Sequence, residues 1–448
     1  MGRAQGAFRR LWMCVAVAVA SLALAPAAHA ALGFQGLTAT PTNANAGAHS
    51  DVNIHIGFTS PGDDVKDLTV SLPPGLVGDP TATPLCTVTQ LQSDSCPSSS
   101  QVGTVTTGAT AHPIPLVSLP LTVNGSLYNV VPAAGQPARF GIVLRPTGSD
   151  PLPLLSKITQ LSDVKLRKSD FGLDTVLTNV PNVAHAANGA VSVPIDITSI
   201  DIHLSGIVGG KGFMRNPTSC GVKTTKFTAD SYAHPNQKAT GQASFTSTNC
   251  AALPFSPTFT ADVGSGGHTQ PLAKPPVTTR ILQDEGEAGL QNAQVLLPQI
   301  LNPDIAPLSN PCPVAKFRSD ASGCPAKSII GSASAISPFL PAPETGLVVI
   351  VAGAGPADLP RLGVDLHGPL ALQLFGSFVF LQAGVGQQFN GLPDIPISNF
   401  TLRFKAGGLL INGGNLCSPP KPVFPVSFTG WNGATRTSKV SATVHGCS

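Results

Sequence analysis

Residues 86–104 read CTVTQLQSDSCPSSSQVGT, and residues 312–332 read CPVAKFRSDASGCPAKSIIGS. In each stretch the second Cys is followed by Pro, by a Ser four residues after the Cys and by a Gly seven residues after it. These positions are Cys96, Ser100 and Gly103 in the first stretch, and Cys324, Ser328 and Gly331 in the second. A segment that occurs twice with the same spacing indicates that part of the chain is duplicated.

The duplication extends to both sides of these segments. A Leu-Pro segment precedes each of them, VSLPPGL at 70–76 and VLLPQIL at 295–301. A further Cys pair follows each of them, and its two members are thirty residues apart in both halves. We therefore expect two tandem domains, residues 31–252 and 253–448, rather than a solenoid, whose repeats span about 20–50 residues.

Alternating apolar residues predict short β-strands in both halves. The pattern is clear in VNIHIGF (52–58), FTLRF (400–404) and KVSATVHG (439–446). It is typical of antiparallel sheets with one face exposed to water. The 46 Gly and 43 Pro residues disfavour long helices. We expect an all-β protein made of two tandem β-sandwich-like domains that arose by internal duplication.

Two segments need a more specific interpretation. In IDITSIDIHL (195–204) the alternation slips by one residue, which predicts a β-bulge. QDEGEAGLQNAQVLL (283–297) has modest helical character, but its place in the duplication predicts a loop followed by a strand.

Residues 1–30 have the features of a secretory signal peptide. Arg3, Arg9 and Arg10 form a basic start, WMCVAVAVASLALA is an apolar core, and the segment ends in Ala-His-Ala, a cleavage site of small residues. No later stretch reaches the roughly 18 consecutive apolar residues that a membrane span requires. We expect an exported protein, secreted or associated with the cell surface, with no membrane span after signal removal.

The cysteines predict disulfides. Eight of the nine lie after the signal peptide, in an oxidising compartment. A zinc site needs CxxC or nearby His ligands, and thioredoxin chemistry needs CxxC, but the spacings of ten and twelve residues provide neither. The duplication favours pairs that close within each half. We predict the pairs Cys86–Cys96, Cys220–Cys250, Cys312–Cys324 and Cys417–Cys447.

Composition limits the partners. Without the three Arg residues of the signal peptide, Lys+Arg falls from 26 to 23 and equals Asp+Glu, so there is no basic excess for binding nucleic acid. Only 11% of residues are charged, against about 25% in typical domains, which makes self-association or an apolar partner plausible. At 5%, aromatic residues are too few to favour a sugar-stacking surface.

No catalytic or cofactor-binding motif is recognisable. LVVIVAGAGPAD (347–358) begins like a dinucleotide-binding strand and loop, but it lacks the third Gly, and Pro356 prevents a helix from starting there. The tripeptide at 170–172, Asp-Phe-Gly, has none of the other kinase motifs beside it. The chain has no GxSxG, and its His residues are scattered singly. We therefore expect no enzymatic activity, no cofactor, and no catalytic or metal-binding residues.

A calcium site is the remaining metal hypothesis. Asp63, Asp64 and Asp67 offer oxygen ligands, but their spacing is not that of an EF-hand loop. Turn-forming Asp residues are the favoured interpretation.

Several segments resemble a family of secreted, mostly actinobacterial proteins for which no function is established. The resemblance covers most of the mature chain and implies secreted tandem β domains without a known activity. IDIHLSG (200–206) departs from the family pattern because it lacks the Trp-Gly-Val-Pro often found there. The matching segments are LPPGL (72–76), the Cys-Pro segment, LYNVVPAAGQPARFG (127–141), LRKSDFGL (166–173), FMRNPTSCG (213–221) and LPDIPISNFTL…LLINGGNLC (392–417).

Three functional hypotheses follow. The leading one is a non-enzymatic structural or interaction protein of the cell envelope or extracellular space, with an envelope polymer or a protein as partner. The alternative is a binder of apolar or lipidic envelope components, suggested by the apolar run LALQLFGSFVFLQAGVG (370–386), although we favour a strand buried on both faces there. The third is an extracellular hydrolase with an unrecognised site. Binding variation is expected first in the Pro-rich loops around 105–120 and 333–345.

Overall fold

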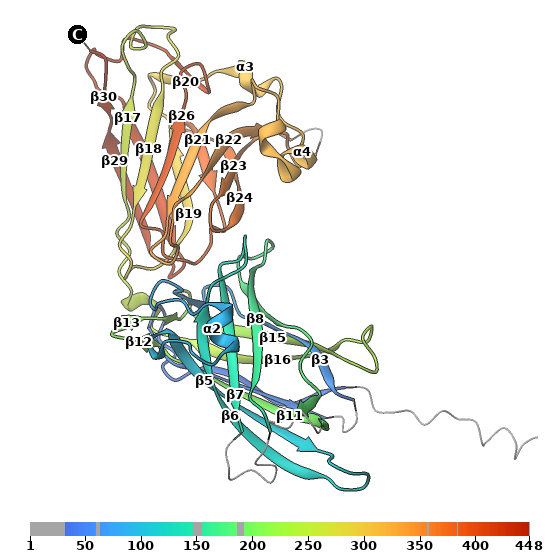
Figure 1. Ribbon diagram of the computed structural model, residues 1–448. Coiled ribbons are helices and arrows are strands. Elements are labelled where there is room, and N and C mark those ends of the chain that lie inside the picture. Colours follow the sequence, from blue (N-terminus) through green and yellow to red (C-terminus); the bar gives the residue numbers. More distant parts are fainter. Residues whose placement is uncertain are drawn as a thin grey trace, which may run out of the picture.

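The computed structural model describes residues 32–59, 63–146, 155–185, 192–355, 358–382 and 384–447, and the signal peptide predicted at 1–30 lies outside them. The described chain is almost entirely β-structure and forms two 12-stranded sheets, one in each half. The two units are stacked end to end, with the second (yellow to red) above the first (blue to green) in Figure 1. The expected all-β fold with two tandem domains is confirmed.

The first unit is one continuous sheet that curls round on itself. Its main strand order is β1-β2-β11-β5-β6-β7-β8-β9-β3-β15-β16, with β10 paired to β11. Its two edge strands, β1 and β16, lie side by side, and a short parallel bridge between Asn45 and Thr248 joins the chain just beyond them. The strands of the main sheet are β1 (Phe34–Pro41), β2 (Val52–Phe58), β3 (Val65–Ser71), β5 (Gln101–Ala111), β6 (Leu119–Val130), β7 (Ala138–Arg145), β8 (Ile158–Leu166), β9 (Leu173–Leu177), β10 (Val183–His185), β11 (Ser192–Leu204), β15 (Gly221–Ser231) and β16 (Ala239–Ser247).

The second unit has the same construction. Its strands follow the order β17-β18-β26-β21-β22-β23-β24-β25-β19-β28-β29, and β30 closes the sheet by pairing in parallel with β17. The strands are β17 (Thr258–Val263), β18 (Val277–Leu282), β19 (Leu290–Leu296), β21 (Ile329–Ile336), β22 (Glu344–Val351), β23 (Arg361–His367), β24 (Ala371–Leu381), β25 (Gly384–Phe389), β26 (Asn399–Phe404), β28 (Val423–Gly430), β29 (Thr435–Ser441) and β30 (Thr443–Val444).

The two strand orders match position by position. β1 corresponds to β17, β11 to β26, β3 to β19 and β16 to β29, so the duplication seen in the sequence is also present in the topology. Small two-stranded sheets complete each unit. They pair β4 (Val77–Gly78) with β14 (Met214–Arg215), β12 (Ile207–Val208) with β13 (Lys211–Gly212), and β20 (Leu301–Pro303) with β27 (Leu410–Asn412).

Each core lies between opposite walls of one curled sheet, which makes the units sandwich-like although neither consists of two separate sheets. Phe227 and Phe424 occupy equivalent places seven residues after a Cys, and both are fully buried. Phe227 packs against Phe34 at 6.2 Å between ring centroids, and Phe424 packs against Phe259 at 6.0 Å. The same aromatic pair therefore anchors both cores, because aromatic rings bury large apolar areas.

The local strand predictions are also confirmed. The register of β11 against β5 shifts between Ile197 and Ser199, where the bulge was expected. The segment 283–289 is a loop and β19 follows it, so no helix forms there. Between the two sheets the chain passes through the short 3-10 helix η2 (Cys250–Ala252). We keep 252/253 as the proposed domain boundary.

The apolar run 370–386 differs from expectation. It contains β24, but this strand is not buried on both faces, since Phe380 is 64% exposed and Leu381 is 49% exposed. On the outer face, Phe375 packs edge-on against Phe317 of the helix α4 (Val314–Ser319). The inner face contributes Leu372, Leu374 and Phe378 to the core, but Phe380, which alternation places on the same face near the end of the strand, is exposed.

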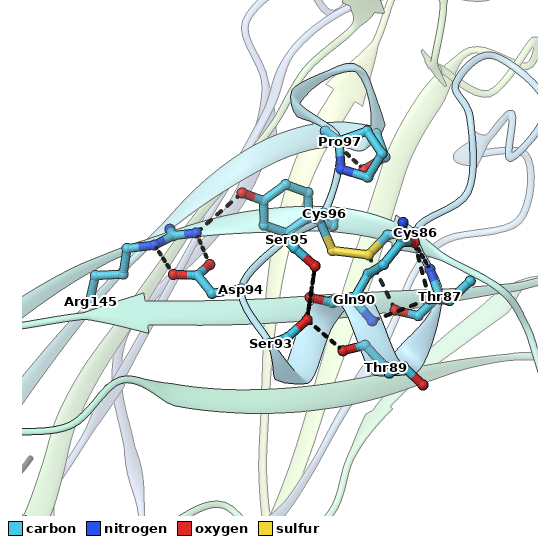
Figure 2. The surroundings of a disulfide bond; sticks show 12 residues. Cys86, Thr87, Thr89, Gln90, Ser93, Asp94, Ser95, Cys96, Pro97 and Arg145 are labelled. Carbon is cyan, nitrogen blue, oxygen red and sulfur yellow. Dashed lines mark hydrogen bonds and ion pairs between the residues drawn. A yellow bond between two sulfur atoms is a disulfide. The ribbon is translucent and has the colours of Figure 1, made fainter.

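All four predicted disulfides are present: Cys86–Cys96, Cys220–Cys250, Cys312–Cys324 and Cys417–Cys447. Figure 2 shows the first of them beside the short helix α2 (Val88–Gln92). Thr87 and Gln90 cap this helix reciprocally, which satisfies two backbone N–H groups at its start. The equivalent disulfide of the second unit encloses α4 and η3 (Ala321–Gly323), which α3 (Ile305–Leu308) precedes in the chain.

The first Cys of each repeated segment joins the sheet directly. The backbone N–H of Cys86 donates to the carbonyl of Asn129 at 2.8 Å, and the N–H of Cys312 donates to the carbonyl of Ile350 at 2.8 Å. The disulfide therefore fastens a helical excursion to a central strand in each unit. This position explains why the segment contains a Cys pair at an equivalent place in both halves.

The Ser and Gly of the repeated segment also have equivalent structural roles. The buried hydroxyls of Ser100 and Ser328 donate to the carbonyls of Pro97 and Pro325, at 2.6 and 2.7 Å, and close the turn after the disulfide. In the second unit, a Cβ placed on Gly331 would lie 2.0 Å from the backbone oxygen of Arg403 on the neighbouring strand. In the first unit, a Cβ placed on Gly103 would lie 2.1 Å from the backbone oxygen of His203. The repeated segment therefore has a structural role in both units: its disulfide, Ser and Gly hold a helical excursion against the sheet.

Replacing Gly331 by Ala is expected to lower the free energy of unfolding by about 2 kcal/mol, because β21 and β26 must separate to admit the methyl group. Chemical denaturation of the mature protein measures this loss. Gly286→Ala is the control, since a Cβ at that position meets nothing within 4 Å. Equal stability of the two variants would show that the backbone of Arg403 does not exclude a side chain at position 331.

Candidate functional site

An apolar cavity of about 160 Å³ lies where the first sheet meets the second unit. The first unit contributes side chains from the inner face of its sheet, and the second contributes loops that cover this end of it. The principal first-unit residues are Leu127, Phe140, Ile142, Val164, Phe171 and Phe213, and those of the second unit are Phe339, Leu340, Leu370, Leu372, Pro393 and Ile395.

Two more apolar cavities continue into the sheets. One of about 130 Å³ lies inside the second sheet, between residues such as Phe259, Leu374 and Phe378. The other, of about 100 Å³, lies deeper in the first sheet, beside residues such as Leu121 and Ile195. Sheets of about eight strands are just filled by their own side chains, whereas larger closed sheets leave internal space. The 12-stranded sheets explain why these interiors are not completely packed.

The three cavities share walls. Ala335, Leu372, Pro393 and Ile397 line both the junction cavity and the cavity of the second sheet. Val70, Ile142, Ser162, Thr175 and Ile202 line both the junction cavity and the deeper cavity of the first sheet. The three cavities are therefore neighbours, and we call the row that they form through both units the internal channel.

The lining of the internal channel is almost without charge. Among the described residues, no Lys, Arg or His contributes to any of the three cavities, and Glu344 is the one ionisable side chain that does. Partly enclosed space of this kind, lined by Leu, Ile and Phe, favours apolar molecules over water. A largely apolar pocket with few polar groups is also the usual form of a small-molecule site.

A buried carboxylate holds the two units together beside the channel. Asp394 lies between Pro393 and Ile395, on the second-unit loop that lines the junction cavity, and only 5% of it is exposed. It accepts hydrogen bonds from the backbone N–H of Thr218, at 2.8 Å, and from the Thr218 hydroxyl. The same hydroxyl accepts a hydrogen bond from the N–H of Gly289 at 3.0 Å. Burial raises the pKa of Asp394, and these hydrogen bonds oppose that rise.

Arg215 provides the positive charge beside this carboxylate. Its guanidinium is buried and donates to the backbone carbonyl of Glu287, in the second unit, at 2.7 Å. Burial lowers the pKa of Arg215, and the attraction of Asp394 opposes that change. Thr218 and Arg215 both belong to the segment FMRNPTSCG, so this segment positions one unit on the other.

The loops expected to carry binding variation have different positions. In the second unit the connection 337–343 between β21 and β22 places Phe339 and Leu340 in the junction cavity. In the first unit the equivalent connection 112–118 is at the surface, where Ile114 and Leu116 are exposed. Only the second loop therefore belongs to the channel.

The predicted aspartates do not form a common site. Asp63 accepts from the N–H of Leu32 at 3.0 Å, Asp64 from the amide of Asn182 at 3.0 Å, and Asp67 from the N–H of Asn179 at 2.9 Å. Burial, together with the neighbouring carboxyl of Asp196, raises the pKa of Asp64 to about 6. Within the described ranges no three His, Cys, Asp or Glu side chains gather as a metal site would require.

One Ser–His–Asp arrangement exists at the surface. Ser118 Oγ lies 3.3 Å from His112 Nδ1, and His112 Nε2 lies 3.1 Å from Asp196. Ser118 is exposed beside the end of the β5–β6 connection, and none of the three residues lines the channel. A hydrolase would need a substrate cleft and oxyanion donors beside the Ser as well.

Sequence reasoning identified the disulfides but did not identify the channel. Two signals pointed toward it: the low content of charged residues and the apolar run 370–386. Leu372, Leu374 and Phe378 of that run line the channel. The other walls come from strands far apart in the sequence.

Comparisons with known proteins give no closer assignment. No family model and no curated protein matches the chain. Among solved structures, it is similar to a protein of Corynebacterium diphtheriae described as membrane anchored, at 9% identity and a TM-score of 0.19 over 76% of this chain and 96% of that one. It is also similar to the type II cohesin dyad from the adaptor ScaA scaffoldin of Acetivibrio cellulolyticus, at 8% identity and a TM-score of 0.15 over 92% and 97%. At these TM-scores neither likeness carries an argument about this chain.

None of the helices in the described residues is both long enough and apolar enough to cross a membrane.

Proposed function

We propose that this protein is an exported, non-enzymatic binding protein that holds an apolar, chain-like molecule in the internal channel. The observation that carries the proposal is the row of three neighbouring apolar cavities through both units, with walls shared at Ala335 and Ile142. The predicted signal peptide and the disulfides support a role in the cell envelope or outside the cell. The proposal favours the apolar-binder hypothesis over binding of an envelope polymer.

The channel favours a linear ligand. Its cavities lie in a row instead of forming one round chamber, and small shifts of the side chains between them, such as Ile142 and Leu372, would let a flexible alkyl chain run from one unit into the other. Burial of a chain contributes about 0.8 kcal/mol for each methylene removed from water. Several methylenes are therefore enough for binding without any charged contact.

The test is displacement of a fluorescent apolar probe, N-phenylnaphthylamine, from the purified mature protein by alkyl chains of octyl and hexadecyl length. Saturable probe binding and stronger displacement by the longer chain are expected. Ala335→Phe narrows the shared wall between the two units and should weaken hexadecyl binding at least tenfold, while octyl binding changes less.

Ser332→Phe is the matched control, because it adds the same ring to the exposed face of the same strand. It should leave both affinities unchanged. Absence of saturable probe binding to the wild-type protein, in a sample shown to be folded, would overturn the proposed function.

The hydrolase hypothesis has one observation in its favour, the Ser118–His112–Asp196 arrangement. Ester hydrolysis by the wild-type protein that disappears in Ser118→Ala would support it. On the present proposal, Ser118→Ala leaves probe binding unchanged, because Ser118 is not part of the channel.

A further inference from the structure

Glu344 has an unused hydrogen-bonding oxygen inside the protein. It is the first residue of β22, lines the junction cavity, and is only 3% exposed. One carboxyl oxygen, Oε1, accepts a hydrogen bond from the N–H of Leu370 at 2.8 Å. The other, Oε2, is buried and has no hydrogen-bond partner among the residues that the structure describes. Buried polar atoms are nearly always hydrogen-bonded, and leaving one unpaired destabilises the fold.

A second polar side chain in the channel also has buried atoms without a hydrogen-bond partner among the described residues. The side-chain amide of Gln387, on β25, lines the cavity of the second sheet. Neither its oxygen nor its nitrogen has a hydrogen-bond partner in the described part of the chain. The channel therefore has unused hydrogen-bonding atoms at two separated points, Glu344 and Gln387, within a largely apolar lining.

The charges around Glu344 exclude some ligands. The imidazole of His367, which lies near Glu344, is 63% exposed and hydrogen-bonds to Asp365 at 2.8 Å. No cationic side chain lines the channel in the described chain. A ligand carboxylate would therefore meet a carboxyl group and have no positive partner, which is unfavourable in a dry interior.

We propose that the ligand is an uncharged amphiphile with a hydroxyl group, which hydrogen-bonds to Glu344 Oε2 while its alkyl chain occupies the internal channel. The inference rests on the proposed function and specifies its ligand class. A hydroxyl fits because it donates to an ionised carboxylate and accepts from a protonated one. Long-chain alcohols and monoacylglycerols belong to this class, and fatty acids do not.

The experiment compares dodecanol with dodecanoate as competitors of bound N-phenylnaphthylamine at neutral pH. The wild-type protein is expected to bind dodecanol at least about tenfold more tightly, because the alcohol gains a charge-assisted hydrogen bond and the acid gains repulsion. Glu344→Gln should reduce this ratio to about threefold or less, since an amide donates to a carboxylate as readily as it accepts from a hydroxyl.

Glu287→Gln is the matched control. Glu287 is equally buried and also has one oxygen without a partner, but it does not line the channel, so its replacement should leave the ratio at the wild-type value. Equal binding of alcohol and acid by the wild type overturns the inference and leaves the proposed function intact. So does an unchanged ratio in folded Glu344→Gln. Absence of probe binding in the wild type overturns both.

Discussion

Replacement of Asp394 by Ala is expected to lower the free energy of unfolding by about 3–5 kcal/mol. Asp394 accepts both hydrogen bonds that Thr218 donates across the junction of the two units. Without the carboxylate, two buried donors lose their acceptor and the buried Arg215 loses its nearby negative charge. Breaking a buried polar network in this way costs more than replacing all of its members by apolar residues.

Trp431 provides the measurement. It is the only Trp after the signal peptide, and its indole N–H donates to the carbonyl of Leu392, two residues before Asp394, at 2.9 Å. Urea unfolding followed by Trp431 fluorescence therefore reports directly on the junction. Asp394→Ala should unfold at a clearly lower urea concentration than the wild type.

Two further variants test whether loss of the Asp394 hydrogen bonds causes the lower stability of Asp394→Ala. Asp284→Ala removes an exposed Asp near the same junction and should change the free energy of unfolding by less than about 0.5 kcal/mol. Thr218→Val removes the hydroxyl and keeps the backbone donor, so its effect should be smaller than that of Asp394→Ala. A midpoint of Asp394→Ala equal to that of the wild type would show that this carboxylate does not hold the units together.

The junction also links stability with binding. Pro393 and Ile397, on either side of Asp394, are among the residues that join the channel of one unit to that of the other. Loss of the Asp394 contacts should therefore weaken binding of a hexadecyl chain more than that of an octyl chain. The hydrogen bonds of Asp394 therefore affect both the stability of the junction and the binding of a long chain in the channel.

Removal of the Cys220–Cys250 disulfide, by replacing both residues with Ala, is expected to cost about 3.5 kcal/mol of unfolding free energy. The two residues are 30 apart in the sequence, and the bridge restricts the unfolded chain over that length. It also fixes the end of the segment that carries Thr218, two residues before Cys220. Its loss should therefore loosen the junction in addition to destabilising the first unit.

The equivalent bridge of the second unit is the natural control. Cys417 and Cys447 are also 30 apart, so the same change in chain entropy applies to their removal, but no junction residue adjoins them. Both double variants should lose similar stability in far-ultraviolet circular dichroism. Trp431 belongs to the second unit, so removal of Cys417–Cys447 should lower its midpoint directly, whereas removal of Cys220–Cys250 should lower it only because the bridge holds Thr218 at the junction. A midpoint at Trp431 equal to that of the wild type in the Cys220/Cys250 variant would refute a role for this bridge in holding Thr218.

Most of the fold followed from local patterns. The strands were predictable because alternation of apolar and polar residues reflects which side of a strand faces the core, as in VNIHIGF. The pairing of the cysteines was predictable because the duplication restricted it to each half. The exposed end of β24 was not predictable, because Phe380 continues the apolar alternation of the core face and no local pattern shows that the rest of the fold leaves the last residues of the strand uncovered.

The duplicated all-β architecture and its four disulfides were predictable from the sequence, since they depend on short-range periodicity and on equivalent spacing in the two halves. The internal channel and the junction arise from the packing of distant segments. Thr218 and Asp394 are 176 residues apart, and Glu344 meets its cavity only where the loops of the second unit cover the first sheet. No local pattern records how the end of one curled sheet packs against another, because that contact depends on the closure and relative placement of both sheets.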